Sequence, residues 1–320
     1  MLIFPQNYFN EEIRDQFTIS STMKRAWAAQ LELLVKIIAV CDKHQIQYHA
    51  TWGTLLGTIR HHGFIPWDDD IDIAMKRSDY IRFLNVAASE FPPEYCILNT
   101  YFTEEWLESF TRITNGQTID ISPQRLKSFH GCPFVIGIDI FPLDNIPDNE
   151  EEANCQLELL SMLHHTSSLL NTCEAYTANK MQPLPEHEAA LEESLAALEA
   201  YSQIPIDRHK NIRNQLERLY DKISMLYWQE DCKYMTLFPF YEDHPEYLFK
   251  SEWFSEYTLM PFENIQIAVP NGYDETLRTF YGDYMVPVQV QDPNHPYPFY
   301  QTQLQELIDR GMWPITDFPD

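Results

Sequence analysis

The chain has 320 residues, and 22 lysines and arginines against 48 aspartates and glutamates give it a formal net charge of −26. Broad binding to nucleic acid or to an anionic membrane surface is not expected, because both require lysine and arginine to replace counterions. Aromatic residues make up 14% of the chain, so disorder over most of its length is excluded as well.

The first half of the chain alternates between helix and strand patterns. Residues 1–22 form a polar lead-in, and apolar residues then recur every three or four positions to about residue 43, which predicts an amphipathic helix. Gly53 begins a short helix, and Ser78 is expected to cap a third one. Strand patterns occupy residues 47–52, 70–74, 95–98, 110–113 and 134–141.

Strand patterns vanish in the middle of the chain. Residues 148–228 carry helical leucine stripes and are interpreted as a helical insertion, with one of its helices beginning at Asp207. Residues 229–320 contain a further strand at 265–269 and are expected to pack back on a core formed by residues 23–147. The mixture predicts an α+β (mixed α/β) fold in which helices flank a mixed β-sheet.

The six cysteines include no C-x-x-C pair, and we expect reduced thiols in a cytoplasmic protein. The N-terminus has no basic region followed by an apolar stretch, so it does not resemble a signal peptide. The most apolar run, Leu31–Val40, is about half the length of a membrane span and contains two charged residues. No stable insertion into a membrane is expected.

Asp70 and Asp72 are the first candidates for a functional site. They are two positions apart in a predicted strand, so their side chains share one face, while Ile71 and Ile73 point the other way. Two carboxylates on one face repel each other unless a cation lies between them, and Mg²⁺ takes oxygen ligands together with substrate phosphates. The alternative, a solvated acidic turn, remains open.

Upstream residues add a possible phosphate site. Gly53 and Thr54 open a helix after a strand, which presents backbone N–H groups and the positive end of the helix. Arg60, on the same helix, could contact a phosphate through both of its terminal nitrogens.

Asp139 lies in the middle of an apolar strand, where a lone carboxylate is costly to bury unless it is paired or bound to metal. Arg112, on another predicted strand, is a further candidate for phosphate binding. For both residues, a simple surface position is the open alternative.

These motifs resemble the LicD family of the nucleotidyltransferase-fold superfamily. The pattern G-T-L-L-G-x-x-R-x-x-G-F-I-P-W-D-D-D-I-D stands at Gly53–Asp72. A second block, I-D-I-F-P-L-D, stands at Ile138–Asp144, and a third, P-x-x-Y-D-x-x-L-x-x-x-Y-G, begins at Pro270. The first block is highly specific and the others moderately so. The helical middle carries no block that matches the family.

The resemblance implies a nucleotidyltransferase-like core and transfer of phosphocholine, or a related phosphoalkyl group, from a CDP-alcohol donor. The acceptor would be a sugar hydroxyl of a cell-surface glycan, such as lipopolysaccharide or teichoic acid, or of its lipid-linked precursor. Attack at the distal phosphorus would release CMP, and the enzyme could visit the inner face of the membrane transiently.

The residues would then divide into two groups. Mg²⁺ or Mn²⁺ would be held by three catalytic carboxylates, Asp70, Asp72 and Asp139, the last of which could instead act as general base. The donor diphosphate would be held by Gly53, Thr54 and Arg60. The resemblance says little about Arg112, which could bind phosphate as well. Trp67 is a candidate aromatic face for a quaternary ammonium group, with packing as the open alternative.

Two other functions remain open. The first is a nucleotidyltransferase that adds a nucleoside monophosphate to a small molecule and releases pyrophosphate. The second is a non-catalytic glycan-binding protein of the same fold, which the presence of all three aspartates disfavours. The identity of the product, CMP or pyrophosphate, separates the two enzymatic alternatives.

Overall fold

A computed structural model describes residues 1–5, 7–289 and 297–315 of the chain. It divides into two compact units. Unit 1 contains residues 1–97, 111–142 and 252–320, and unit 2 contains residues 98–110 and 143–251. Helices flank a mixed sheet, as the α+β prediction required.

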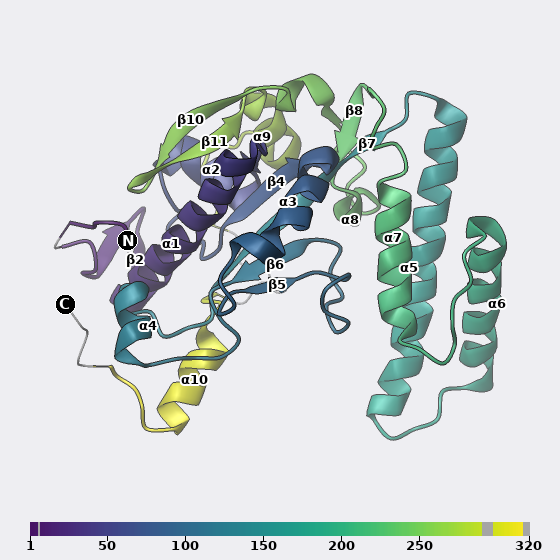
Figure 1. The fold of residues 1–320 in the computed structure, drawn as a ribbon, viewed down its shortest axis with the longest axis horizontal. Helices are drawn as coiled ribbons and strands as arrows, with labels where there is room; N and C mark the ends of the chain where they lie inside the picture. Colours follow the sequence, from purple (N-terminus) through teal and green to yellow (C-terminus); the bar gives the residue numbers. More distant parts are fainter. Residues whose placement is uncertain (6, 290–296, 316–320) are drawn as a thin grey trace. The chain divides into compact units, whose positions relative to one another are not determined.

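Unit 1 contains most of the strands (Figure 1). It also has the larger apolar core. Its sheet has the order β3-β4-β7-β6-β5. Its helices are α1 (Ser21–His44), α2 (Trp52–His61), α3 (Arg77–Glu90), α4 (Pro123–Ser128), the 3₁₀ turn η1 (Ser251–Phe254), α9 (Tyr273–Tyr281) and α10 (Gln301–Asp309). Its strands are β1 (Glu12–Arg14), β2 (Phe17–Ile19), β3 (His49–Ala50), β4 (Asp72–Lys76), β5 (Cys96–Leu98), β6 (Thr111–Thr114), β7 (Gly137–Ile146), which continues into unit 2, β10 (Tyr257–Phe262) and β11 (Ile265–Pro270).

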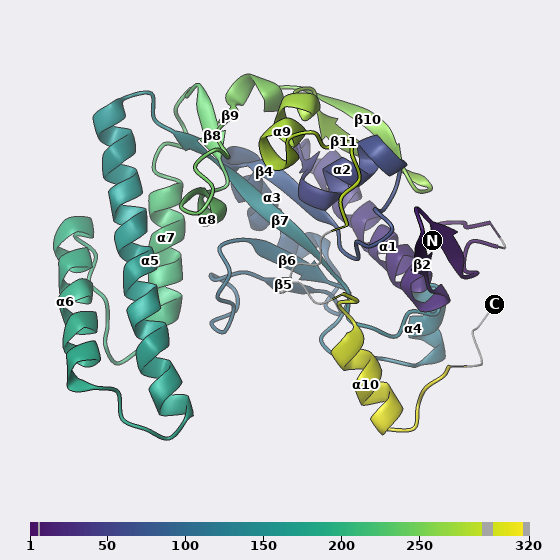
Figure 2. The ribbon, with the colours of Figure 1, turned by 180° about the vertical axis from the view of Figure 1, so that it is seen from behind.

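The helices of unit 1 cover both faces of this sheet. Figure 1 shows α1 and α3 over one face, and Figure 2, from behind, brings α2 and α9 to the front. The first predicted helix is confirmed as α1: the Ser20 hydroxyl accepts a hydrogen bond from the N–H of Met23, and Gln45 ends the helix in the left-handed conformation. The Trp27 ring stacks on that of Phe64, with 4.6 Å between centroids, in the middle of the core.

Several local predictions differ from the structure. Strand β4 begins at Asp72, so Asp70 lies in the segment before the strand and not within it. Helix α3 begins at Arg77 without a side-chain cap, which places Ser78 inside the helix. The lead-in contains a two-stranded hairpin, β1–β2, whose three-residue strands are too short to give a periodic pattern.

Unit 2 has an apolar core of its own. The predicted leucine stripe is confirmed, since Leu195 and Leu198 are fully buried. The helix expected from Asp207 begins at Ile212 instead, capped by the Asn211 side chain. The elements are α5 (Glu150–Ala178), α6 (Pro185–Ser202), α7 (Ile212–Ser224), β8 (Tyr234–Thr236), α8 (Phe238–Tyr241) and β9 (Phe249–Lys250).

Unit 2 also extends beyond the predicted insertion. Strand β8 pairs with the last residues of β7, from Asp144 to Ile146, and with β9, which draws residues 229–251 into this unit. The segment 98–110 belongs to it too, because α7 binds this segment. The Asn214 amide and the Arg218 guanidinium both donate to the Thr100 carbonyl at 3.0 Å, and the Tyr101 hydroxyl donates to Asp221 at 2.8 Å.

Two expectations for the whole chain can be compared with the structure. All six cysteines are free thiols, and Cys155 is the exposed one. Within the described ranges, the apolar stretch of every helix is too short or too charged to cross a bilayer.

Candidate active site

The three consecutive aspartates have different surroundings. Asp69 is fully buried, and its carboxylate accepts a hydrogen bond from the Phe299 N–H at 2.5 Å. The backbone carbonyl of Asp69 accepts from the Gln30 amide at 2.6 Å. Asp69 therefore ties α1 and the C-terminal segment to this turn, and its carboxylate contributes to folding.

Asp68 lies at the start of α2. A β-carbon built on Gly53 would come within 2.2 Å of Asp68 Oδ2, so any other residue at this position would force the Asp68 carboxylate to shift. The carbonyl of Asp68 accepts from the Trp27 indole N–H at 3.1 Å, which holds the turn in place. Asp68 was not singled out from the sequence, although it stands in the same acidic run.

Thr54 connects this helix to the strand that carries the aspartates. Its hydroxyl accepts a hydrogen bond from the N–H of Asp72 at 2.8 Å, and the N–H of Thr51 donates to the Asp72 carbonyl at 3.2 Å. The first turn of α2 has no side-chain cap. Thr54 thus binds the backbone of Asp72, and the positive end of the helix dipole lies beside the strand that carries this carboxylate.

Asp72 is the electrostatic centre of the group. Its pKa is raised well above the ordinary value, first by burial and then by the negative charges of Asp70, Asp139 and Asp68, while Arg112 acts in the opposite direction. The N–H of Asp139 donates to the Ile71 carbonyl at 3.2 Å, which joins β7 to the segment before β4. Four carboxylates from two strands and a turn therefore share one negative field, which we call the acidic face (Asp68, Asp70, Asp72 and Asp139).

Arg112 pairs with Asp139 across the sheet. The two residues are opposite each other in the antiparallel β6–β7 ladder, and Nε and Nη2 of Arg112 donate to the two carboxylate oxygens at 2.5 and 2.6 Å. Gly137 allows this, because a β-carbon there would come within 2.8 Å of Arg112 Cδ. The structure therefore pairs Asp139, which was proposed from the sequence as a metal ligand, with Arg112, which was proposed for phosphate binding.

The donor atoms of the acidic face fit a hard divalent cation. Carboxylate oxygens are the ligands that Mg²⁺ and Mn²⁺ favour. The pKa of Asp72 is raised first by burial and then by the neighbouring carboxylates, so a cation at these oxygens would favour its ionised form. Among the described residues, Asp68, Asp69 and Asp70 form a group of candidate ligands, with one oxygen of each within 4.8 Å of the others. This group shares Asp70 with the predicted set, and Asp72 and Asp139 lie outside it.

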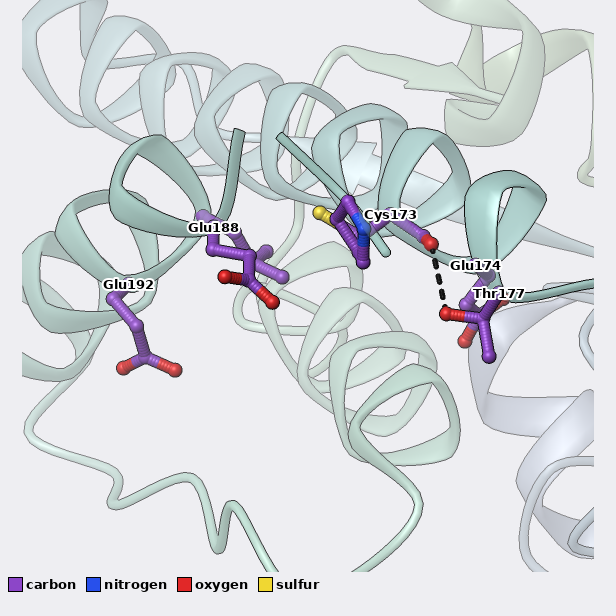
Figure 3. Close-up of a pocket in the computed structure, with 7 residues that line it drawn as sticks. Cys173, Glu174, Thr177, Glu188 and Glu192 are labelled. Carbon is purple, nitrogen blue, oxygen red and sulfur yellow. Dashed lines mark hydrogen bonds between the residues drawn. The ribbon is translucent and has the colours of Figure 1, made fainter. Parts of the chain in front are cut away.

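A cavity in unit 2 is separate from these aspartates. It measures about 660 Å³ and lies between α5 and α6, where Cys173, Glu174, Glu188 and Glu192 are among the residues that line it (Figure 3). It contains none of the residues predicted for the site.

Comparison with known proteins now bears on this arrangement. Residues 45–168, which include α2, β4, β6 and Asp139, match the family model described as LicD/FKTN/FKRP, nucleotidyltransferase domain. This stretch of the chain is therefore similar to the LicD-family nucleotidyltransferase domain. The chain is 28% identical over 279 residues to the lipopolysaccharide cholinephosphotransferase LicD of Haemophilus influenzae. The aligned region covers 86% of this chain and 96% of that protein. Two uncharacterised proteins match over 44 residues, which is 14% of this chain. The protein of Rickettsia typhi is 48% identical over 14% of its length, and that of Rickettsia prowazekii is 46% identical over 16% of its length.

The first and third LicD-like blocks lie against each other within unit 1. The rings of Trp52, in α2, and Phe280, in α9, are 4.2 Å apart between centroids. Arg60 lies at the other end of α2, about 10 Å along the axis from Gly53, and donates to the Tyr284 carbonyl at 2.9 Å. The structure thus does not bring Arg60 together with Gly53 and Thr54, and instead uses it to attach the third block.

Trp67 also contacts other residues of unit 1. Its ring lies edge-on to Phe17 at 6.3 Å and to His61 at 6.5 Å. These contacts account for its position by packing, and its assignment to the donor remains a prediction.

Proposed function

We propose that this protein transfers phosphocholine, or a closely related phosphoalkyl group, from a CDP-alcohol to a sugar hydroxyl of a surface glycan or its precursor, with release of CMP. The observation that carries the proposal is the acidic face beside the uncapped start of α2, found within the residues that match the LicD/FKTN/FKRP family model. The named LicD relative, which covers 86% of this chain, supports phosphocholine as the group.

We assign the binding of Mg²⁺ or Mn²⁺ to Asp70, Asp72 and Asp139, with Asp68 as an additional ligand from the same turn. Such a cation would act as a Lewis acid on the diphosphate and neutralise the charge that develops on the leaving CMP. Asp139 already uses both oxygens in its pair with Arg112. We therefore assign it to binding rather than to proton transfer.

The chain's own residues would orient the donor. The backbone N–H groups of Gly53 and Thr54 and the Arg112 guanidinium supply donors for the diphosphate oxygens. The acceptor oxygen then forms a bond to the distal phosphorus, and the bond from that phosphorus to the bridging oxygen breaks. A carboxylate of the acidic face other than Asp139 receives the acceptor proton.

The test is donor turnover by the purified full chain. CDP-choline, CDP-ethanolamine, CDP-ribitol and CDP-glycerol are offered with Mg²⁺ or with EDTA, and CMP is measured by chromatography. We expect Mg²⁺-dependent CMP release from CDP-choline or one close relative, and its loss in Asp72→Asn. Asp243→Asn, at an exposed position in unit 2, is the matched control. Release of pyrophosphate from a nucleoside triphosphate instead of CMP would replace this proposal with nucleotidyl transfer.

A further inference from the structure

Arg112 is a cation placed within the acidic face. Besides its two hydrogen bonds to Asp139, it interacts with the charges of Asp72 and Asp70. Burial lowers the pKa of Arg112, but these partners raise it by more, so the group is charged under all working conditions. Part of the negative field is therefore balanced by the chain itself.

The pair is asymmetric in exposure. The Arg112 side chain is 42% exposed, whereas that of Asp139 is 12% exposed. Its stem lies over Gly137, where no side chain blocks its path. Asp139 is held by the backbone of a central strand, while the guanidinium is at the end of a long, flexible, partly hydrated side chain. Arg112 is the partner that can move.

We propose that Arg112 is an internal counter-ion whose guanidinium competes with the divalent cation for Asp139, and whose departure from Asp139 makes it available to the donor diphosphate. This rests on the proposed function, since it concerns the metal and donor of the same site. It adds a regulatory step: Arg112 opposes metal binding in the absence of donor and favours donor binding once the metal is present.

The physical basis is charge and ligand capacity. A bidentate guanidinium occupies both oxygens of the carboxylate, in the geometry that makes this pair strong. A divalent cation at the same oxygens would also repel the guanidinium at close range. The diphosphate offers a second bidentate partner, so Arg112 exchanges one anion for another and remains paired. Coupling between two ligands through such an exchange typically changes affinity by about 5- to 150-fold.

Mn²⁺ binding to the full chain without nucleotide tests this, measured by electron paramagnetic resonance of free Mn²⁺. We expect Arg112→Met to bind Mn²⁺ about tenfold more tightly than the wild type. Arg112→Lys should also bind more tightly than the wild type, because it keeps the charge but cannot occupy both oxygens. Arg310→Met, which removes an arginine paired with Glu306 on α10, is the control and should leave Mn²⁺ affinity unchanged.

CDP binding at saturating Mn²⁺ provides the second measurement. It should weaken about tenfold in Arg112→Met, so that the two affinities change in opposite directions. Circular dichroism and the melting temperature verify that the variants are folded.

Three results would overturn the inference. Equal or weaker Mn²⁺ binding by Arg112→Met would show that Arg112 does not compete with the metal. Tighter Mn²⁺ binding by Arg112→Met, with the Mn²⁺ affinity of Arg112→Lys unchanged, would show that only the net charge matters. Arg112 would then not compete with the metal for the Asp139 carboxylate. If neither the wild type nor any variant binds Mn²⁺, both the inference and the metal requirement of the proposed function are wrong. If all of them bind Mn²⁺ equally, only the inference is wrong and the proposed function stands.

Discussion

Gly53 and Asp68 are in direct contact at the start of α2, where the carboxylate lies in the space that any other residue's β-carbon would fill. Gly53→Ala should therefore displace Asp68 or the first turn of the helix. We expect CMP release to fall by about 100-fold or more, because a misplacement of about 1 Å at a reacting site has effects of this size. Gly116→Ala is the control, since its nearest neighbours would lie at an ordinary 3.4 Å. Full activity in Gly53→Ala would show that the contact between Gly53 and Asp68 is not needed for CMP release.

Asp72→Asn should make the metal-free protein more stable and inactive. Burial and the charges of Asp70, Asp139 and Asp68 disfavour its ionised form, so removal of that charge relieves repulsion. We expect the free energy of unfolding to rise by about 1 kcal/mol. Mg²⁺ should stabilise the wild type and have little effect on this variant. Urea denaturation with and without Mg²⁺ measures both, and a less stable metal-free variant would contradict the electrostatic account.

His49 should make the protein sensitive to acid. It is fully buried in β3 between Phe254 and Tyr257, neither ring nitrogen has a hydrogen-bond partner in the described structure, and its pKa is lowered to about 3, first by burial and then by Lys76. The unfolded chain binds a proton near pH 6.5 while the folded chain does not, so stability falls as the pH drops below that value.

Between pH 6.5 and 5 this one group should cost about 2 kcal/mol. Urea denaturation across this range measures the loss. His49→Leu should remove that part of the acid dependence, and His165→Leu, at an exposed position on α5, should not. An unchanged pH profile in His49→Leu would place the acid sensitivity in another group.

Arg60→Met distinguishes the two roles considered for Arg60. Its guanidinium donates to the Tyr284 carbonyl, away from the helix start. We expect a loss of about 1 kcal/mol in stability, the usual contribution of one such hydrogen bond, with CDP affinity changed by less than about threefold. Isothermal titration and melting curves give the two values. A large loss of CDP affinity at normal stability would restore the phosphate-binding role predicted from the sequence.

Leu195→Ala tests the independence of unit 2. Leu195 is fully buried in the separate core formed by α5, α6 and α7, and its truncation should cost about 3 kcal/mol. Hydrogen exchange should accelerate in α5 and α6 and remain slow in α1. Leu31→Ala, in the core of unit 1, is the mirror control. Equal acceleration in both units for both variants would mean that they unfold together.

The amino-acid sequence predicts the elements with long or strong local patterns. Helix α1 follows from a stripe of apolar residues, and the acidic run stands out because charge at that density is unusual beside alternating isoleucines. The hydrogen bond from the Asp72 N–H to the Thr54 hydroxyl was not predicted, because it joins residues 18 positions apart that only the folded chain brings together. The small strands β1 and β2 escape prediction because three residues are too few to show a period.

The sequence by itself thus indicated the α+β class and the longest helices, and it proposed Asp70, Asp72 and Asp139 as one candidate site. Tertiary structure alone decided the partners. The β6–β7 register places Arg112 opposite Asp139. Unlike the neighbouring aspartates, Asp69 is buried, and it accepts a hydrogen bond from the Phe299 N–H. Arg60 donates a hydrogen bond to the Tyr284 carbonyl. The reason is physical: periodicity reports which face of an element is apolar, whereas ion pairs and buried hydrogen bonds depend on residues that only the folded chain brings together.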